Sequence, residues 1–469
     1  MSVPGWVKKA IFYQIFPDRF ANGDQRIDPP NVKPWITTPS MYGFHGGDLA
    51  GIQMKFDYLL DLGVNAIYLN PIFQAASNHR YDTMDYFRID PKLGSTKDFI
   101  EFIETAHKND IRVILDGVFN HCGRGFFAFN DILENGKHSP YREWFHVHTF
   151  PVDAYSPGEA RDYAAWWNHK SLPKFNTSNP SVRAYLLDVA RHWINLGADG
   201  WRLDVPNEID DDSFWSEFRS IVKTENPEAY LLGEIWHADP HWVDDDHFDA
   251  LMNYPTRETI LDLLENNIST SHFADKVEGF LNLYSIENTF VMYNSLGSHD
   301  TARIFTLFDG DVRKVKLAFL FIFGYPGVPA IYYGDEIGTP GGKDPGCRRA
   351  FLWDSSKWNH EIRNWIMKLI RLRKRYESLQ TGSFKRLLVD DTQRVYVFAR
   401  TLRDEFLIFA LNSSSVAAEI QIPVDELGTE NDANLHCLTE QFDRNEYMVQ
   451  DKKISLKLPP FEGAVFSWN

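Results

Sequence analysis

The order of strand-like and helix-like segments is the feature that most restricts the fold of this 469-residue chain. Eight short apolar runs have the composition of buried strands, at residues 10–16, 64–70, 111–116, 198–203, 229–233, 248–252, 290–296 and 327–333. Helical patterns occur between several of these runs and after the last, at 49–62, 96–109, 182–196, 212–225 and 359–376. This alternation is typical of parallel α/β proteins, whose crossovers allow an open sheet or a closed barrel. Eight strands favour the closed (β/α)8, or TIM, barrel.

Two regions depart from this alternation. Residues 117–177 are rich in aromatic and polar residues without clear periodicity, which indicates a subdomain inserted after the third strand. Strand-like runs at 395–400, 405–412 and 418–423, with a turn between two of them, indicate an antiparallel β domain. We therefore expect a barrel formed by residues 1–116 and 178–379, a subdomain at 117–177 and a C-terminal β-sandwich domain at 380–469.

Charge and cysteine content narrow the classes of partner. The net charge is −17 and the chain has no basic run, which argues against nucleic acid and anionic membranes. Its three cysteines, at positions 122, 347 and 437, are too few and too far apart for a disulfide framework. The first residues lack a secretory-signal pattern, and no apolar run reaches the length of a membrane span. We expect a cytoplasmic protein without an organic cofactor.

Ionisable residues stand where several of the strand-like runs end. They are His121, Arg202, Asp204, Glu234, His299 and Asp300. Period-two alternation places Arg202 and Asp204 on the same face of one strand. Because the C-terminal ends of barrel strands form one rim, we expect all six side chains to converge there.

Two carboxyl groups on either side of one bond are what glycoside hydrolysis requires: an ionised nucleophile and a proton donor with a raised pKa. Asp204 suits the first role, because the Arg202 guanidinium lowers the pKa of a neighbouring carboxyl group. Glu234 suits the second, because Ile235 and Trp236 offer an apolar setting that keeps it protonated. Asp300 would then hold sugar hydroxyls near the transition state.

Other interpretations of these residues stay open at this point. Arg202 and Asp204 taken alone also fit a structural ion pair at a strand end. The acids and histidines also fit a divalent-metal site, although the Arg202 guanidinium would repel a cation. A barrel that only binds or regulates is a third alternative, against which three intact acids weigh.

These segments resemble the four short motifs of the α-amylase family of retaining glycoside hydrolases. The matching segments are 116–121, 200–204, Glu234 with its flanks, and 298–300, in the family's order. The resemblance, which spans the barrel and the C-terminal domain, implies that Asp204 is the nucleophile, Glu234 the general acid/base and Asp300 the transition-state stabiliser. It also implies that the subsite of the reacting glucose is lined by Tyr81, Asp82, His121, Arg202 and His299.

Further segments resemble one subgroup of that family. Residues 172–176, Leu-Pro-Lys-Phe-Asn, are similar to a marker of the neopullulanase, cyclomaltodextrinase and maltogenic amylase subgroup, as are segments 205–208, 234–237 and 344–349. The resemblance places Asp344 and Arg348 on the non-reducing side of the cleft, and Trp236 and Asn207 on the acceptor side. It implies hydrolysis of α-1,4 and also α-1,6 bonds in cyclodextrins, pullulan and maltooligosaccharides, with transglycosylation. An enzyme mainly for α-1,6 debranching or for glucan transfer is the alternative.

Members of this subgroup usually carry an additional N-terminal β domain that builds a dimer and narrows the cleft. This chain begins almost at the first strand of the barrel. We therefore expect that any oligomer does not form through such a domain, and that a more open cleft admits branched glucans.

The resemblance also implies a structural calcium site. The matching positions are Asn22, Asp24, Asp28, Gly46 and Asp48. Asparagine, aspartate and backbone carbonyls supply the oxygen ligands that Ca²⁺ requires. Some relatives have an asparagine where this chain has Ile27, which offers only its backbone carbonyl. The alternative is that Asn-Gly-Asp at 22–24 forms only a turn.

Overall fold

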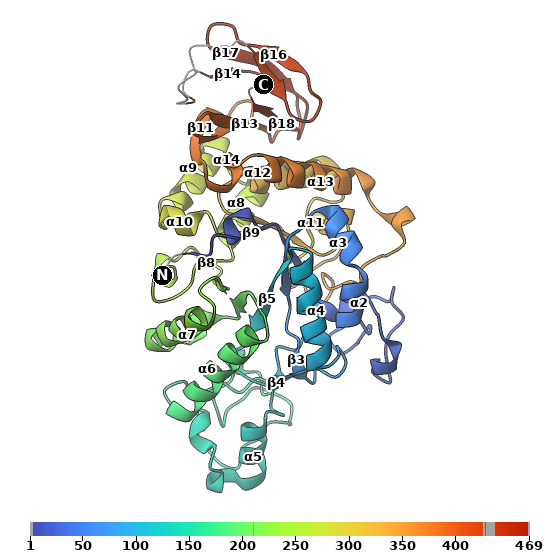
Figure 1. The fold of residues 1–469 in the computed structure, drawn as a ribbon, viewed down its shortest axis with the longest axis vertical. Helices are drawn as coiled ribbons and strands as arrows, with labels where there is room; N and C mark the ends of the chain where they lie inside the picture. The colour runs from blue at the N-terminus through green and yellow to red at the C-terminus, as the bar shows by residue number, and fades with distance from the viewer. Residues whose placement is uncertain (1–2, 210, 425–426, 428–436, 468–469) are drawn as a thin grey trace.

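A closed barrel lies in the middle of an elongated molecule (Figure 1), in a computed structural model that describes residues 3–209, 211–424, 427 and 437–467. Its eight parallel strands are arranged in the order β8-β7-β6-β5-β2-β1-β10-β9. They are β1 (Phe12–Ile15), β2 (Ala66–Leu69), β5 (Arg112–Gly117), β6 (Gly200–Leu203), β7 (Tyr230–Gly233), β8 (Ala250–Leu251), β9 (Tyr293–Ser295) and β10 (Val328–Tyr332). A parallel bridge between Met252 and Tyr293 joins the two ends of the sheet. The TIM barrel predicted from the sequence is confirmed.

The register of the strands brings polar residues to one rim. The strands themselves are almost wholly buried, as their continuous apolar runs predict. Asp116 of β5 pairs with Arg202 of β6, and Leu203 pairs with Gly233 of β7. The residues that follow β6 and β7, Asp204 and Glu234, therefore emerge side by side.

Helices surround the sheet on the outside. The longer ones near the barrel are α4 (Thr96–Lys108), α6 (Pro180–Asn195), α7 (Asp212–Glu225), α8 (Tyr254–Leu264), α9 (Thr270–Leu281), α12 (Val312–Gly324) and α13 (His360–Arg375). Their first turns carry the expected signals: α4 begins with a capping box formed by Ser95 and Asp98, and α6 has Asn179 as its N-cap, followed by Pro180.

The helix predicted at 49–62 is two helices, α2 (Leu49–Met54) and α3 (Phe56–Leu62). Lys55 breaks it, with φ −107° and ψ 13°. The apolar side chains of both helices, among them Ile52 and Phe56, are buried in the same core. Because the apolar pattern runs on across Lys55, periodicity alone does not reveal the break.

The segment between β5 and α6 forms the end of the molecule that lies opposite the C-terminal sheet (Figure 1). It contains α5 (Phe127–Asn135), and its two ends pair where His121 bridges Lys174. Buried aromatic side chains such as Phe129 and Phe145, 5.0 Å apart between ring centroids, fill its interior. Short turns and single bridges account for its lack of periodicity. The boundaries of the predicted subdomain, 117–177, stay a prediction.

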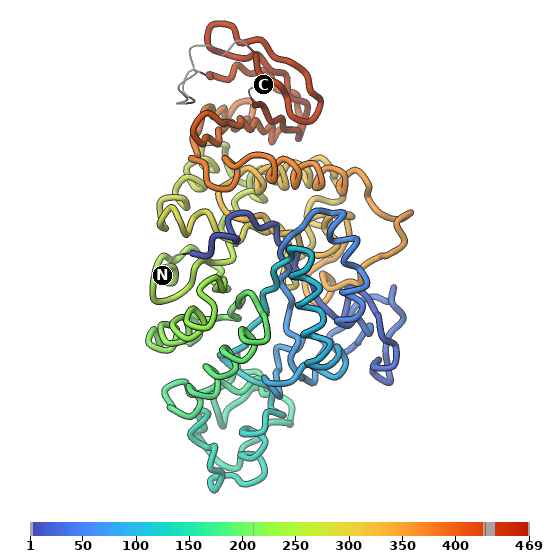
Figure 2. The backbone as a smooth tube through the Cα atoms, viewed as in Figure 1, coloured from blue at the N-terminus to red at the C-terminus, as the bar shows by residue number. Residues whose placement is uncertain are grey.

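The C-terminal region is antiparallel and lies at one end of the chain trace, where side chains such as Phe398 and Phe409 join the core of the barrel (Figure 2). Six strands form one sheet: β11 (Ser383–Asp390), β12 (Val395–Leu402), β13 (Glu405–Asn412), β18 (Gly463–Ser467), β15 (Cys437–Glu440) and β16 (Glu446–Met448). Two more, β14 (Ala418–Pro423) and β17 (Lys453–Leu458), form a second sheet over a shared apolar core. Arg400 Nη1 donates to Gly324 O of α12 at 2.8 Å and so attaches this region to the barrel. The predicted range 380–469 includes residues 425–426, 428–436 and 468–469, which lie outside the described residues.

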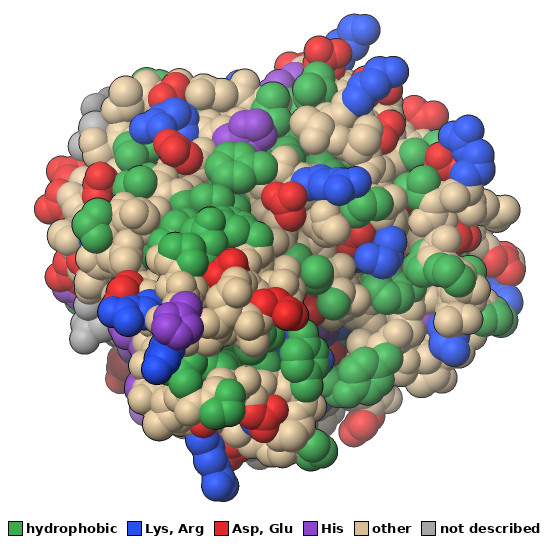
Figure 3. Space-filling view, turned by 90° about the horizontal axis from the view of Figure 1, so that it is seen from below, with side chains coloured by type: hydrophobic (Ala, Val, Ile, Leu, Met, Phe, Trp, Pro, Cys, Tyr) green, Lys and Arg blue, Asp and Glu red, His purple; other side chains and the backbone are tan. Residues whose placement is uncertain are grey.

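In the described part of the chain, no helix combines the length and apolar character needed to span a bilayer. On the face of the molecule seen in Figure 3, acidic and basic side chains are interspersed among apolar ones.

Candidate active site

Arg202 is fully buried at the C-terminal rim of the barrel. Its Nη1 donates to Asp116 Oδ1 at 2.9 Å and to Asp204 Oδ1 at 3.0 Å. Its Nη2 lies 2.5 Å from Glu234 Oε1, an ion pair whose angle is not that of a hydrogen bond. One guanidinium thus gathers three carboxyl groups from the ends of β5, β6 and β7.

The two acids beside Arg202 start from rigid backbone. The N–H of Asp204 donates to Gly117 O, and that of Glu234 donates to Leu203 O, each at 3.0 Å. Val205 N–H donates to Glu234 Oε2 at 3.1 Å. Val205 has φ 37° and ψ 51°, a left-handed conformation that costs a β-branched residue about 1–3 kcal/mol. This strained turn directs a backbone donor at Glu234.

Burial raises the pKa of Glu234 to about 7, although Arg202 opposes the shift. Burial also raises the pKa of Asp204 well above its usual range, with a further contribution from Glu234. Arg202 lowers the pKa of Asp204, as the sequence predicts, but burial raises that pKa by more than Arg202 lowers it. The two carboxyl groups titrate as a pair and retain a proton up to near neutral pH.

Asp300, unlike Asp204 and Glu234, has a lowered pKa. His299 Nε2 lies 2.9 Å from Asp300 Oδ2, and Arg348 Nη2 lies 3.2 Å from Asp300 Oδ1. Burial acts to raise the pKa of Asp300, but His299 and Arg348 outweigh it and hold the pKa well below its usual range. An ionised carboxylate therefore stands in the same site as a protonated one, which is the condition for dividing roles between acids.

The tautomer of His299 follows from its neighbours. Its Nδ1 faces the side-chain amides of Gln14 and Asn70, each at 3.0 Å, and so accepts hydrogen bonds. The proton therefore lies on Nε2, which is 2.6 Å from the Tyr81 hydroxyl. The Tyr81 ring stacks on His299 with centroids 5.3 Å apart and planes 11° apart, and its hydroxyl donates to Asp116 Oδ2 at 2.8 Å.

His121 provides an unpaired polar atom at the rim. Its ring is buried and stacks on Trp166 of the inserted segment, with centroids 5.5 Å apart. Burial lowers the pKa of His121 to about 3, so the ring is neutral at ordinary pH. Its Nε2 has no hydrogen-bond partner among the described residues. Such an atom is costly to bury and is available to a sugar hydroxyl.

The structure also brings together the residues predicted for the non-reducing side. Arg348 Nη1 lies 3.1 Å from Asp344 Oδ1, so Arg348 links Asp344 to Asp300. Asp82 is half-buried and accepts a hydrogen bond from the Ser77 hydroxyl. Burial raises the pKa of Asp82 and that of Asp344.

On the predicted acceptor side, Trp236 is 48% exposed. It stacks on Tyr254 with centroids 3.9 Å apart and planes 2° apart. Asn207 is exposed on the turn Pro206–Glu208, which is tied to the inserted segment because Lys174 Nζ donates to Glu208 O. An exposed aromatic face and an exposed amide suit a surface that binds sugar.

Several residues of this site are not among those predicted. They are Gln14, Tyr68, Asn70, Asp116 and Tyr254. Asp116 and Asn70 stand at strand ends, as the predicted acids do, and that position is the signal that identifies them. Tyr254 has no such signal, because its role depends on the path of the loop that carries Trp236.

One of the residues predicted to bind calcium has a side-chain oxygen without a hydrogen-bond partner. Asn22 Oδ1 is buried without a hydrogen-bond partner among the described residues, and Asn22 Nδ2 donates to Asp28 Oδ1 at 2.8 Å. Gly46 has φ 81°, and a Cβ there would lie 2.4 Å from Asp28 Oδ1. Asp48 is already engaged by three backbone N–H groups, and Asp24 is paired with exposed Arg26 at 2.7 Å. The oxygen-only donors and the cradle at Gly46 fit Ca²⁺, with Asp24 available once it leaves a weak surface pair.

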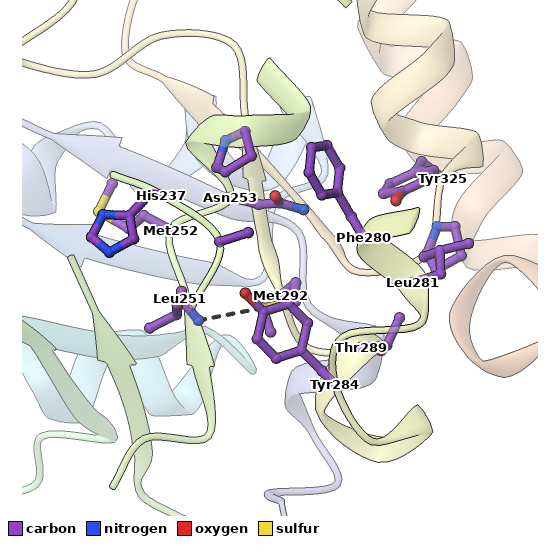
Figure 4. A pocket seen from close by; sticks show the side chains of 13 residues that line it. His237, Leu251, Met252, Asn253, Phe280, Leu281, Tyr284, Thr289, Met292 and Tyr325 are labelled. Carbon is purple, nitrogen blue, oxygen red and sulfur yellow. Dashed lines mark hydrogen bonds between the residues drawn. The ribbon is translucent and has the colours of Figure 1, made fainter. Parts of the chain in front are cut away.

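A separate pocket lies between the loop after β7 and helices α8 and α9 (Figure 4). Its lining includes His237, Asn253, Phe280, Tyr284 and Met292, and a hydrogen bond from Leu251 N to Met292 Sδ, 3.4 Å long, crosses its wall. None of its lining residues carries a carboxyl group. This pocket therefore offers no carboxyl group for acid/base chemistry.

A TIM barrel with paired acids on its C-terminal rim defines a class, the barrel-fold glycoside hydrolases. Within that class the chain belongs to the α-amylase family, because the description of the alpha amylase catalytic domain matches residues 14–377. The protein is thus an enzyme, an α-amylase family glycoside hydrolase.

Relatives of known name agree with this assignment. A cyclomaltodextrinase from Geobacillus thermopakistaniensis is 44% identical over 474 residues, which cover 100% of this chain and 79% of that protein. Neopullulanase 2 from Thermoactinomyces vulgaris is 41% identical over 100% of this chain and 79% of its own length. An intracellular maltogenic amylase from Bacillus subtilis is 43% identical over 90% of this chain and 71% of its own length.

Solved structures are similar over the whole chain. The debranching enzyme from Nostoc punctiforme has a TM-score of 0.90 and 39% identity, and the match covers 100% of both chains. The cyclic α-maltosyl-(1→6)-maltose hydrolase from Arthrobacter globiformis has a TM-score of 0.91 and 36% identity, again over 100% of both chains. A cyclomaltodextrinase structure has a TM-score of 0.93 and 41% identity over 99% of this chain and 79% of its own.

Proposed function

We propose that this enzyme hydrolyses α-1,4 and α-1,6 glucosidic bonds in cyclodextrins, pullulan and maltooligosaccharides with retention of configuration, and that it also transfers glycosyl groups. The observation that carries the mechanism is the contact of one buried guanidinium, Arg202, with both Asp204 and Glu234. This contact holds the proposed nucleophile and the proposed acid side by side, and the two carboxyl groups together retain one proton.

The reaction proceeds by double displacement. Asp204, ionised, attacks the anomeric carbon while Glu234 gives its proton to the departing glycosidic oxygen, so that a glycosyl ester forms on Asp204. Glu234, now a carboxylate, takes a proton from water, whose oxygen attacks the same carbon and releases Asp204. A sugar hydroxyl in place of water gives transglycosylation.

The neighbouring residues assist this chemistry. Burial raises the pKa of Glu234 to about 7 and also raises that of Asp204, so that the pair keeps one proton, and the mechanism assigns this proton to Glu234. Ionised Asp300 accepts hydrogen bonds from sugar hydroxyls and favours a distorted ring. His121, which is neutral, and His299, with its proton on Nε2, complete the subsite of the reacting glucose together with Tyr81, Asp82 and Arg202. Asp344 and Arg348 bind on the non-reducing side, and Trp236 and Asn207 on the acceptor side.

The names of the relatives support these substrates, since cyclomaltodextrinase and neopullulanase are similar over the whole chain. A second candidate is an enzyme mainly for α-1,6 bonds. The match to the Nostoc punctiforme debranching enzyme, 39% identical over 100% of both chains, favours it.

Product analysis separates the two candidates. The enzyme is incubated in parallel with γ-cyclodextrin, pullulan, maltoheptaose and a branched α-1,6 dextrin, and the anomeric form of each first product is read by NMR. Ring opening and panose release from pullulan, with α-anomers formed first, are expected. Linear chains released from the branched substrate, with the ring and maltoheptaose untouched, would establish the debranching candidate instead. β-Anomers as first products would exclude the retaining mechanism.

We also propose that Asn22, Asp24, Asp28, Gly46 and Asp48 hold a structural Ca²⁺ ion. The orphaned Asn22 Oδ1 and the cradle at Gly46 support this proposal. Calcium at 100 times its dissociation constant would add about 2.7 kcal/mol to the free energy of unfolding. Chelated enzyme should recover its melting temperature with CaCl₂, and Asn22→Ala should lose that recovery. A melting temperature that does not respond to calcium contradicts the proposal.

A cytoplasmic location is part of the proposal and rests on the name of the intracellular maltogenic amylase from Bacillus subtilis, 43% identical. The proposed partners of the enzyme are α-glucans.

A further inference from the structure

A cluster of metal-binding side chains lies outside the site of the three acids. Among the described residues, Asp212, His241 and His247 each offer one ligand atom, and these atoms lie within 4.8 Å of one another. Asp212 is the first residue of α7, His241 is in the turn Pro240–Trp242, and His247 precedes β8. We propose that these three side chains bind a divalent transition-metal ion of the Zn²⁺ class.

The spacing of the ligand atoms is that of a tetrahedral ion. His241 Nε2 lies 3.1 Å and His247 Nε2 lies 3.6 Å from the same Asp212 Oδ1. A tetrahedral Zn²⁺ ion with bonds near 2.0–2.1 Å separates neighbouring ligand atoms by about 3.3 Å. Little movement is therefore needed to place an ion between the three atoms.

His247 presents a lone pair that has no partner. Its side chain is 6% exposed, and its Nδ1 lies 2.8 Å from Asp244 Oδ1. Because a carboxylate only accepts, Nδ1 carries the proton, and in the neutral ring Nε2 is therefore an acceptor. Nε2 has no hydrogen-bond partner in the described part of the chain, and the atom that it faces, Asp212 Oδ1, also belongs to an acceptor. A cation between these two atoms, which lie 3.6 Å apart, would satisfy both of them.

The surroundings of His247 fit a ligand that is held in place. A carboxylate on the far nitrogen, here Asp244, is the usual means of fixing the orientation of a metal-binding histidine. The ring also packs against Trp242, with centroids 5.4 Å apart. Imidazole and carboxylate donors together suit zinc and its neighbours rather than calcium or magnesium. Asp212 and His241 have side chains 60% and 49% exposed, which gives the ion a route from solvent and leaves the fourth position to water.

The ion would fasten the loop 234–249 to the outer helix α7. This loop starts at Glu234 and carries Trp236. Its polar contacts with α7 include Ser216 Oγ with Asp246 Oδ1 at 3.3 Å and Arg219 Nη1 with His247 O at 3.2 Å. Three metal bonds would add a far stronger link. The site is thus a structural clasp on the segment that follows the proposed acid/base residue.

Zinc titration of the whole protein tests the proposal. The protein is treated with chelator, returned to buffer with saturating Ca²⁺ so that the loop at Asn22 is filled, and titrated with ZnCl₂ in a calorimeter. We expect one Zn²⁺ ion per chain and a rise in melting temperature with added zinc. Co²⁺ in place of Zn²⁺ should give the strong visible absorption of a tetrahedral ion. A titration without a saturable one-to-one step overturns the proposal.

Variants show which residues hold the ion. His241→Gln alters an exposed side chain and should abolish the one-to-one step, and Asp244→Asn, which keeps an acceptor oxygen, should weaken binding by about 10–100-fold. His360→Gln changes another exposed histidine, in the first turn of α13, and should leave binding intact. Equal melting temperatures without zinc show that the variants fold. Equal zinc affinity in His241→Gln and the parent overturns the proposal.

Discussion

The barrel contains two buried groups of charges with opposite compositions. One is centred on a cation, Arg202 near the end of β6, and the other on a carboxylate, Asp249 immediately before β8. Around Asp249, two cations meet one carboxylate: Arg219 Nη1 lies 3.0 Å from Oδ1 and Lys223 Nζ lies 2.8 Å from Oδ2. Leu231 N donates to the same Oδ2 at 2.9 Å. Both oxygens of Asp249 are therefore satisfied.

Around Arg202, one cation meets three carboxyl groups, and burial, with a smaller contribution from the neighbouring acids, raises the pKa of two of them. Arg202 Nε has no hydrogen-bond partner among the described residues, nor has His121 Nε2 nearby. Asp249 lies at the N-terminal end of the barrel strands and Arg202 at the C-terminal end, and these ends serve stability and chemistry respectively. A cluster whose one carboxylate is fully paired with cations holds the barrel together, whereas a cluster with an excess of carboxyl groups is ready for a substrate and a proton.

Asp204→Asn tests the rim cluster where the effect is largest. It removes the proposed nucleophile and should lower kcat on maltoheptaose on the order of 10⁴-fold or more. The melting temperature should stay level or rise, because a neutral amide relieves a carboxyl group whose buried charge is unfavourable. Turnover near that of the parent would show that the nucleophile is a different residue.

Asp249→Asn makes the same chemical change in the other cluster and should have the opposite outcome. Two buried cations lose their counter-charge, which should cost about 3–5 kcal/mol of unfolding free energy. Urea denaturation measures this loss, and kcat per folded molecule should be retained. Full stability in this variant would remove the distinction between the two clusters.

The pH profile sharpens the comparison. Because the pKa of Glu234 is raised from 4.5 to about 7, the proton donor is lost above that pH, and kcat/KM should fall about tenfold per pH unit there. The folded protein binds this proton more tightly than the unfolded chain. Stability from Glu234 is therefore lost as the pH rises from 4.5 to about 7, and changes no further above that. Glu234→Gln should remove that part of the pH dependence of the melting temperature; an unchanged profile would contradict the shift.

Val205→Gly should have the smallest effect. The change releases the backbone strain of a valine at φ 37°. Glycine loses more conformational entropy on folding, which costs about 0.5–1 kcal/mol. The net change in the free energy of unfolding should therefore be within about 1 kcal/mol. The loosened N–H should position Glu234 less well and lower kcat a few-fold. Val205→Ala, which keeps a Cβ, is the matched control and should retain more of kcat than the glycine variant.

The barrel was predictable because its strands are buried on both faces and so appear as continuous apolar runs. The rim acids were predictable as positions, since each follows a strand. The contacts among these acids were not predictable. Asp116 lies beside Arg202 because of the register of β5 against β6, and the sequence of a single strand does not determine that register. The state of Asp204 was predicted only in part, since burial, which depends on the whole fold, outweighs the adjacent guanidinium. The assignment of roles to the site residues stays a prediction.

Two further features, the break at Lys55 and the Asp212–His241–His247 cluster, were not predictable from sequence patterns. In the first, an apolar pattern continues while the backbone does not. In the second, residues without any shared pattern are brought together because the loop after β7 folds back on α7. Both depend on contacts between segments that are not neighbours in the sequence.

The narrow join of the barrel at β8 has a kinetic consequence. β8 has two residues and meets β9 through the bridge from Met252 to Tyr293, with Asn253 N donating to Tyr293 O at 2.9 Å. A short seam opens at lower free energy than the longer ladders elsewhere in the sheet, so its amide hydrogens should exchange with solvent first among the strands. Opening there would release Tyr254, which supports the exposed ring of Trp236. The part of the barrel that opens most readily is therefore also the part that supports Trp236, the side chain proposed for the acceptor side.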